Sequence, residues 1–111
     1  GFQMDMTLNK AAGHRLDGAM AGGYADDRIP GEGTVNDYLS VINYRRNASC
    51  LELYVRDCGD ASEAFDKIKE KLDKRFQSKT DRKYSLEYYR SLGMAHREKD
   101  GKQYFVVILM R

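Results

Sequence analysis

The chain has 111 residues, of which 41% are hydrophobic and 32% charged, a composition that suits one soluble globular domain over residues 1–111. Nineteen basic residues nearly balance seventeen acidic ones, so the net charge of +2 lacks the basic excess typical of nucleic-acid-binding proteins. No run of about 18 apolar residues is present, which excludes a membrane-spanning helix. We therefore expect neither a nucleic-acid partner nor a membrane span.

The first predicted element is a helix over Thr7–Met20. Apolar side chains recur in it at every third or fourth position and so share one face. Thr7 is suited to the N-cap, and the pair Gly22-Gly23 is expected to end the helix. The polar residues Asn9, Lys10, Arg15 and Asp17 are assigned to the other face.

A loop is predicted over residues 22–34, which contain four glycines, the single proline and the pair Asp26-Asp27. Two adjacent carboxylates in a glycine-rich loop are typical of solvated turn residues, although the same pair could bind a cation. The next segment, Val35–Asn43, has the pattern of a short amphipathic helix.

A strand is predicted over Cys50–Val55, followed by a turn over Asp57–Ala61. Asp60 and Glu63 have the spacing of a capping box, which predicts that a helix begins there. Its charged face is interpreted as solvated surface. Its apolar face is formed by Ala64, Phe65, Ile68, Leu72 and Phe76.

A hairpin is predicted over Leu92–Met110, because Asp100-Gly101 separates two strand-like runs and suits a two-residue type I′ turn. Its second strand, Tyr104–Met110, is seven consecutive apolar residues. A strand without a polar face is covered on both sides and lies centrally in its sheet. The predicted fold class is a layered α+β domain with a mainly antiparallel sheet.

Few residues carry recognisable site chemistry. The two histidines, His14 and His96, are far apart in the sequence, and no metal-ligand or phosphate-loop motif is present, so we expect no metal and no cofactor. The cysteines Cys50 and Cys58 leave two alternatives: a disulfide across a short loop in a secreted protein, or two separate reduced thiols.

Several blocks of the chain resemble the CAP superfamily, which includes cysteine-rich secretory proteins, pathogenesis-related proteins and bacterial SCP-like domains. Residues 2–15 resemble its second helix, with an apolar residue, Asp, Leu, a pair of alanines and a basic residue in order. Residues 23–27 and 51–54 resemble the Gly-aromatic-Ser-His and Gly-Glu-Asn segments, and residues 89–107 resemble the closing hairpin. The resemblance implies a three-layer α-β-α sandwich and an extracellular or cell-surface location. The family's first helix, and any leader peptide, would lie before Phe2.

The resemblance also implies a central cleft, but with altered residues. Family members that bind a divalent metal use two histidines and acidic partners there. In this sequence Asp27 occupies the first histidine position, and no histidine lies in residues 71–80, where the second is expected. Glu52 is carried over as the acidic position, with Glu70 as a further candidate. The expected cleft thus contains Asp27, Glu52 and Glu70 and no metal.

We therefore expect a secreted or surface-attached binding module rather than an enzyme. Its loops 22–34 and 43–50 would border a shallow groove for a small lipid, a peptide or a protein surface. Two alternatives stay open. One is a hydrolase with Asp27 and Glu52 as an acid/base pair, and the other is an unrelated intracellular interaction domain with both thiols free. The oligomeric state is not predicted.

Overall fold

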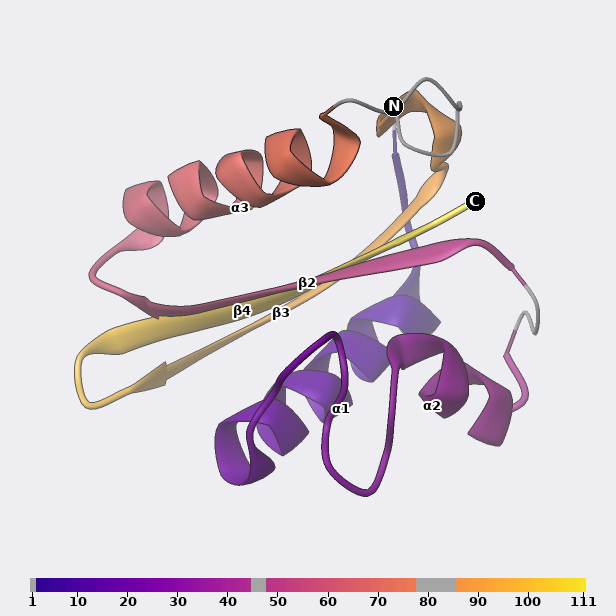
Figure 1. Cartoon of the computed structure of the whole chain (residues 1–111), viewed down its shortest axis with the longest axis horizontal. Coiled ribbons are helices and arrows are strands. Elements are labelled where there is room, and N and C mark those ends of the chain that lie inside the picture. The colour runs from indigo at the N-terminus through magenta and orange to yellow at the C-terminus, as the bar shows by residue number, and fades with distance from the viewer. Residues whose placement is uncertain (1, 45–47, 78–85) are drawn as a thin grey trace.

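The computed structural model of the chain describes residues 2–44, 48–77 and 86–111. These residues form an α+β fold with three α-helices and a four-stranded mixed sheet (Figure 1). The helices are α1 (Met6–Gly22), α2 (Val35–Val41) and α3 (Ala61–Phe76), with a 3-10 helix, η2, over Leu86–Tyr88. The strands are β1 (Gln3–Met4), β2 (Cys50–Cys58), β3 (Ser91–Lys99) and β4 (Lys102–Met110). No described helix is long and apolar enough to cross a membrane.

The predicted hairpin is confirmed. β3 and β4 pair antiparallel from Ser91 opposite Met110 to Lys99 opposite Lys102, and the turn residues Asp100 and Gly101 have φ values of 53° and 77°. The sheet order is β1-β3-β4-β2, so the apolar strand β4 is central, as its sequence predicts. The short strand β1, which was not predicted, pairs parallel with the start of β3 and makes the sheet mixed.

Helices lie on both faces of the sheet, with α1 and α2 on one side and α3 on the other (Figure 1). This explains why β4 has no polar face. Val106, Ile108 and Met110 join the buried cluster that contains the apolar residues of α1 and α2. Val107 and Leu109, which alternate with them, join a second cluster, against which apolar residues of α3 pack.

Helix α1 differs from its prediction at its first turn. The N-cap is Asp5 and not Thr7, because the Asp5 side chain accepts a hydrogen bond from the Leu8 amide at 3.0 Å. The end of the helix is as predicted, with Gly23 at the C-cap and a φ of 97°. The helix packs so closely on β3 that a Cβ added at Gly93 would lie 2.4 Å from the Leu8 backbone.

Helix α3 is capped by Asp60, which accepts from the Glu63 amide at 2.8 Å. The Glu63 carboxylate returns to the Gly59 amide rather than to Asp60, so only half of the predicted capping box forms. The prediction that Phe65 faces the core is wrong, since it is 62% exposed. Ala64, which was predicted on the same face, is buried.

The possible disulfide between Cys50 and Cys58 is also contradicted. β2 continues beyond its predicted end, through an irregularity in its register after Val55, and reaches Cys58. The two cysteines therefore lie at opposite ends of one strand, roughly 25 Å apart at the usual rise per residue. A disulfide requires Cα atoms within about 7 Å, and both thiols are free.

Candidate ligand-binding groove

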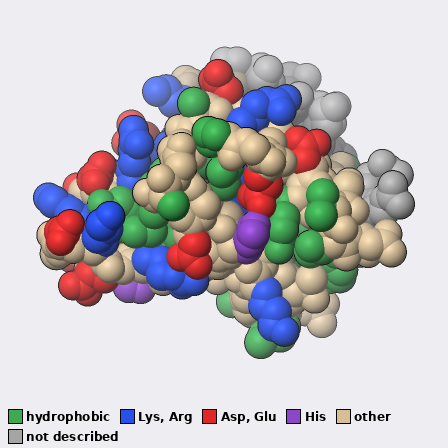
Figure 2. Space-filling model, turned by 90° about the horizontal axis from the view of Figure 1, so that it is seen from below, with side chains coloured by type: hydrophobic (Ala, Val, Ile, Leu, Met, Phe, Trp, Pro, Cys, Tyr) green, Lys and Arg blue, Asp and Glu red, His purple; other side chains and the backbone are tan. Residues whose placement is uncertain are grey.

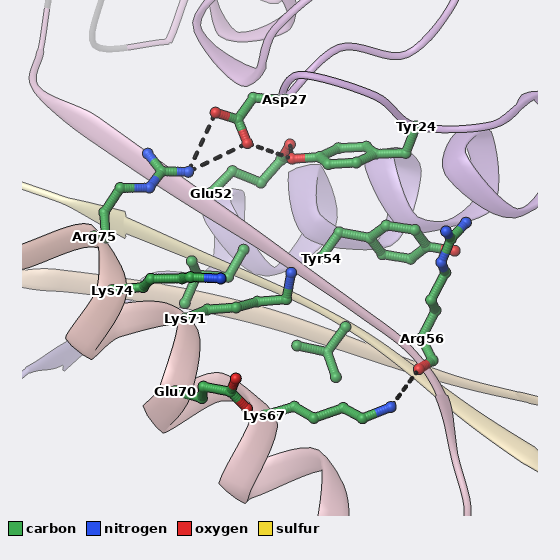
Figure 3. A pocket seen from close by; sticks show the side chains of 12 residues that line it. Tyr24, Asp27, Glu52, Tyr54, Arg56, Lys67, Glu70, Lys71, Lys74 and Arg75 are labelled. Carbon is green, nitrogen blue, oxygen red and sulfur yellow. Dashed lines mark hydrogen bonds and ion pairs between the residues drawn. The ribbon is translucent and has the colours of Figure 1, made fainter.

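A groove of about 680 Å³ runs along β2, between α3 and the loop that follows α1 (Figure 3). It contains all three acidic residues of the expected cleft, Asp27, Glu52 and Glu70. Of the described residues 43–44 and 48–50, none lines it, although the loop 43–50 was predicted to border it. The full lining is Tyr24, Asp27, Glu52, Leu53, Tyr54, Val55, Arg56, Lys67, Glu70, Lys71, Lys74 and Arg75.

One wall of the groove is the outer edge of β2, which ends the sheet. Beyond the paired strands, Arg111 donates its amide to the Ser49 carbonyl at 3.0 Å. Because bonding groups alternate along an antiparallel strand, Leu51 and Leu53 also turn their amides and carbonyls toward β4. Those of Glu52 and Tyr54 consequently point to the outer edge, where no other described strand pairs with them.

The Glu52 side chain is held by a buried arginine of α1. Arg15 Nε and Nη2 each donate to a different carboxylate oxygen of Glu52, both at 2.7 Å, and Arg15 is 0% and Glu52 3% exposed. The remaining guanidinium nitrogen, Nη1, donates to Glu32 at 3.0 Å and to the Gly33 carbonyl at 2.8 Å. Burial would lower the pKa of Arg15, but the hydrogen bonds and charges of Glu52 and Glu32 outweigh it and raise that pKa.

Tyr24 connects Glu52 to Asp27 on the side of the groove opposite α3 (Figure 3). Its hydroxyl lies 2.9 Å from a Glu52 carboxylate oxygen and 3.3 Å from an Asp27 carboxylate oxygen, so it can donate to either. Burial, followed by the charge of Glu52, strongly raises the pKa of Tyr24. The phenol therefore stays protonated near neutral pH and acts as a hydrogen-bond donor.

Asp27 is positioned by the loop backbone, where its φ is 60°. Its carboxylate oxygens lie 3.2 and 3.3 Å from one nitrogen of Arg75 on α3. This exposed ion pair spans from the loop to the helix at one end of the groove (Figure 3).

Lysine residues of α3 form the cationic wall of the groove. Lys67 contacts Glu63 at 3.6 Å and donates to the Arg56 carbonyl at 3.3 Å. Lys71 and Lys74 are exposed and take part in none of the ion pairs formed among the described residues. Both extend into the groove (Figure 3).

The two carboxylates of the alternative acid/base pair already have hydrogen-bond partners. Arg15 and Tyr24 already occupy both oxygens of Glu52, and Arg75 is paired with Asp27. A proton on a substrate would have to compete with these bonds for either carboxylate. Within the described ranges, no three histidine, cysteine or acidic side chains are grouped so that they could hold a metal ion.

The histidines lie outside the groove. His14 stacks on Tyr38 with ring centroids 4.2 Å apart and contacts Glu32, while His96 contacts Gln103 in the hairpin. Residues 78–80, part of the stretch in which the resemblance expects a second histidine, are outside the described residues.

The sequence interpretation missed Arg15, Tyr24 and the lysines of α3. Arg15 was assigned to the polar face of its helix, yet it lies seven positions after Leu8 and four after Ala11, on the apolar stripe. Helical spacing alone would have placed Arg15 on the buried face.

No family model, curated protein or solved structure matches this chain.

Proposed function

We propose that this protein is a binding module whose groove takes an anionic ligand. The proposal rests on which charged side chains of the groove have an ion-pair partner and which do not. Lys71 and Lys74 point into it without an ion-pair partner among the described residues, whereas its carboxylates Glu52 and Asp27 are each paired with an arginine.

The charge balance of the lining supports an anion. Five lining side chains are cationic and three are carboxylates. One of those carboxylates, Glu52, is neutralised from within the core by Arg15, which is not itself in the lining. Two of the lining cations, Arg56 and Lys67, contact carboxylates outside the lining, Asp57 at 4.0 Å and Glu63 at 3.6 Å. The positive excess therefore comes from Lys71 and Lys74, with Glu70 opposing them, and an anion would offset it through charge-assisted hydrogen bonds.

The positive excess is local. On the face seen in Figure 2, basic and acidic side chains are interspersed among apolar and uncharged ones. This agrees with the nearly balanced composition of the chain. That face therefore offers an anion no basic area comparable to the lysines of the groove.

A melting experiment tests the proposal, with sodium tripolyphosphate as a generic polyanion. A ligand at a hundred times its Kd stabilises a protein by about 2.7 kcal/mol, which for a domain of this size is a rise in Tm of roughly 10 °C or more. We expect such a rise for the wild type and its loss in the double variant Lys71→Glu/Lys74→Glu. Lys69→Glu makes the same type of substitution, with half the total charge change, at an exposed position of α3 outside the groove and should retain it. Equal shifts in all three proteins would contradict a ligand in the groove.

We further propose that the fold is the three-layer sandwich of the CAP superfamily, without its metal-binding histidines. Two of the blocks that carry the resemblance meet in the groove, where Tyr24 lies 2.9 Å from Glu52. In CAP proteins the first helix precedes the helix that residues 2–15 resemble. A helix ahead of Phe2 in the full-length protein would support membership, and its absence would contradict it.

Secretion or surface attachment stays part of the proposal through the same resemblance. The argument from a disulfide no longer supports it, since both thiols are free. Fractionation of producing cells tests the location directly: recovery of the protein only from the cytoplasm would contradict it.

A further inference from the structure

We infer that the ligand is an extended acidic peptide that adds to the outer edge of β2 as a fifth strand of the sheet. The inference rests on the proposed anion-binding function of the same groove. It is carried by the coincidence of an unpaired strand edge and a cationic helix along one groove.

The strand edge provides the main-chain partners. The amides and carbonyls of Glu52 and Tyr54 point away from β4 toward the groove. Strand edges of this kind bind extended peptides through main-chain hydrogen bonds. This edge is recessed, since Tyr54 is only 9% exposed. A peptide would therefore satisfy polar groups that have little access to water, and its entry requires the exposed lysine side chains to turn outward.

The length of the groove fits a short segment. The lining includes five consecutive residues of β2, Glu52–Arg56. At the rise of a β-strand these residues extend over about 17 Å, the length of a five-residue peptide.

The spacing of the lysines on α3 determines where along the peptide acidic residues would be favoured. Lys67 and Lys71 are one helical turn apart, about 6 Å along the axis, and alternate side chains on one face of a strand are about 7 Å apart. Acidic residues at every second position of the peptide would therefore lie opposite successive lysines of α3. The three lysines that line the groove allow two or three such contacts.

The opposite side of the groove favours different residues. Tyr24 and Tyr54 lie there with ring centroids 4.9 Å apart, and the Asp27 carboxylate would repel an acidic side chain. The preferred ligand is thus a strand that alternates acidic residues, which face α3, with uncharged residues, which face the tyrosines.

Fluorescence anisotropy with a labelled octapeptide of alternating Glu and Thr tests this. We expect binding to the wild type and to Lys69→Glu, and binding at least tenfold weaker to Lys71→Glu/Lys74→Glu. Two further peptides carry N-methyl groups on all Glu or on all Thr amides. Since only one edge of the added strand meets β2, one methylated peptide should lose binding at least tenfold while the other retains it.

Hydrogen exchange provides a second measurement. The Tyr54 amide should exchange at least tenfold more slowly when the parent peptide is bound. Equal binding of both methylated peptides, or loss of both, would overturn strand addition. Binding of an eight-nucleotide single strand without binding of the peptide would overturn the peptide as ligand.

The two proposals fail separately. If tripolyphosphate raises the Tm through Lys71 and Lys74 but no peptide binds, the groove is an anion site and strand addition is wrong. If neither binds, the anion-binding function falls as well.

Discussion

Arg15 and Glu52, which are 37 positions apart in the sequence, form a bidentate ion pair inside the protein, with both donor–acceptor distances at 2.7 Å. The pair joins α1 to β2, and through Glu32 and Gly33 it also fixes the loop that borders the groove. Removal of one partner leaves a buried charge without compensation.

We expect Arg15→Leu to lower the free energy of unfolding by about 3–5 kcal/mol, because Glu52 would then be buried and unpaired. Urea denaturation measures this. The double variant Arg15→Leu/Glu52→Leu should be more stable than Arg15→Leu, since it removes both charges. Arg28→Leu, at an exposed arginine whose Asp37 contact is 3.9 Å long, is the control and should cost less than about 1 kcal/mol. A single variant as stable as this control would show that the pair does not hold the fold.

Asp27→Asn should strengthen anion binding several-fold while changing stability by less than about 1 kcal/mol. The ion pair that it removes is exposed, so its energy is small, but Arg75 would be released toward the groove. Titration with tripolyphosphate measures the affinity. Asp17→Asn removes the comparable surface pair with Arg97 and should leave the affinity unchanged. Weaker binding by Asp27→Asn would contradict this, and would indicate that Asp27 holds Arg75 in the position that the anion needs.

Gly93→Ala should destabilise the protein by at least about 1–3 kcal/mol, the usual cost of overpacking. The added methyl group would meet the backbone of Leu8 at 2.4 Å, which only a movement of α1 could relieve. Gly22→Ala is the matched control, because nothing lies within 4 Å of a Cβ at that position. Thermal or urea unfolding of the two variants compares them, and equal stabilities would contradict the close packing of α1 on β3.

Stability should decline as the pH rises above about 9, in part through Cys50. Burial, and then the charge of Glu52, raises the pKa of its thiol to about 12. An unfolded thiol ionises near pH 8.5, so between these values the unfolded state releases a proton that the folded state keeps. The stabilisation is present below the unfolded pKa, and on the order of 3 kcal/mol of it is lost by pH 11.

The variant Cys50→Ala should show a shallower loss of stability between pH 8 and pH 11, as measured by urea unfolding. Met20→Ala truncates a partly buried side chain of the same cluster without removing a titrating group, so it should keep the wild-type slope. Parallel slopes for Cys50→Ala and the wild type would mean that the thiol ionises equally easily in both states.

The parts of the fold that depend on local patterns could be predicted from the sequence. The Asp100-Gly101 turn and the apolar run before Met110 determine the hairpin and the central place of β4 through neighbouring residues alone. The two-residue strand β1 has no such pattern, because its pairing with Ser91 and Leu92 depends on how α1 docks.

The candidate site was predicted only in part. Asp27, Glu52 and Glu70 were singled out through a resemblance, and all three line the groove. The residues around them were not predicted, because helical periodicity identifies the solvated face of α3 but not which of its lysines point toward β2. Arg15 was misassigned because its charge outweighed its position on the apolar stripe.

The sheet order has a consequence for how the protein is made. β4 follows every other described element in sequence, yet it is the strand that separates β2 from β3 and completes both buried clusters. During synthesis, α1, β2 and α3 leave the ribosome before β4 does. Their apolar surfaces stay exposed until β4 emerges, a period in which nascent chains of this topology are open to aggregation and to chaperones.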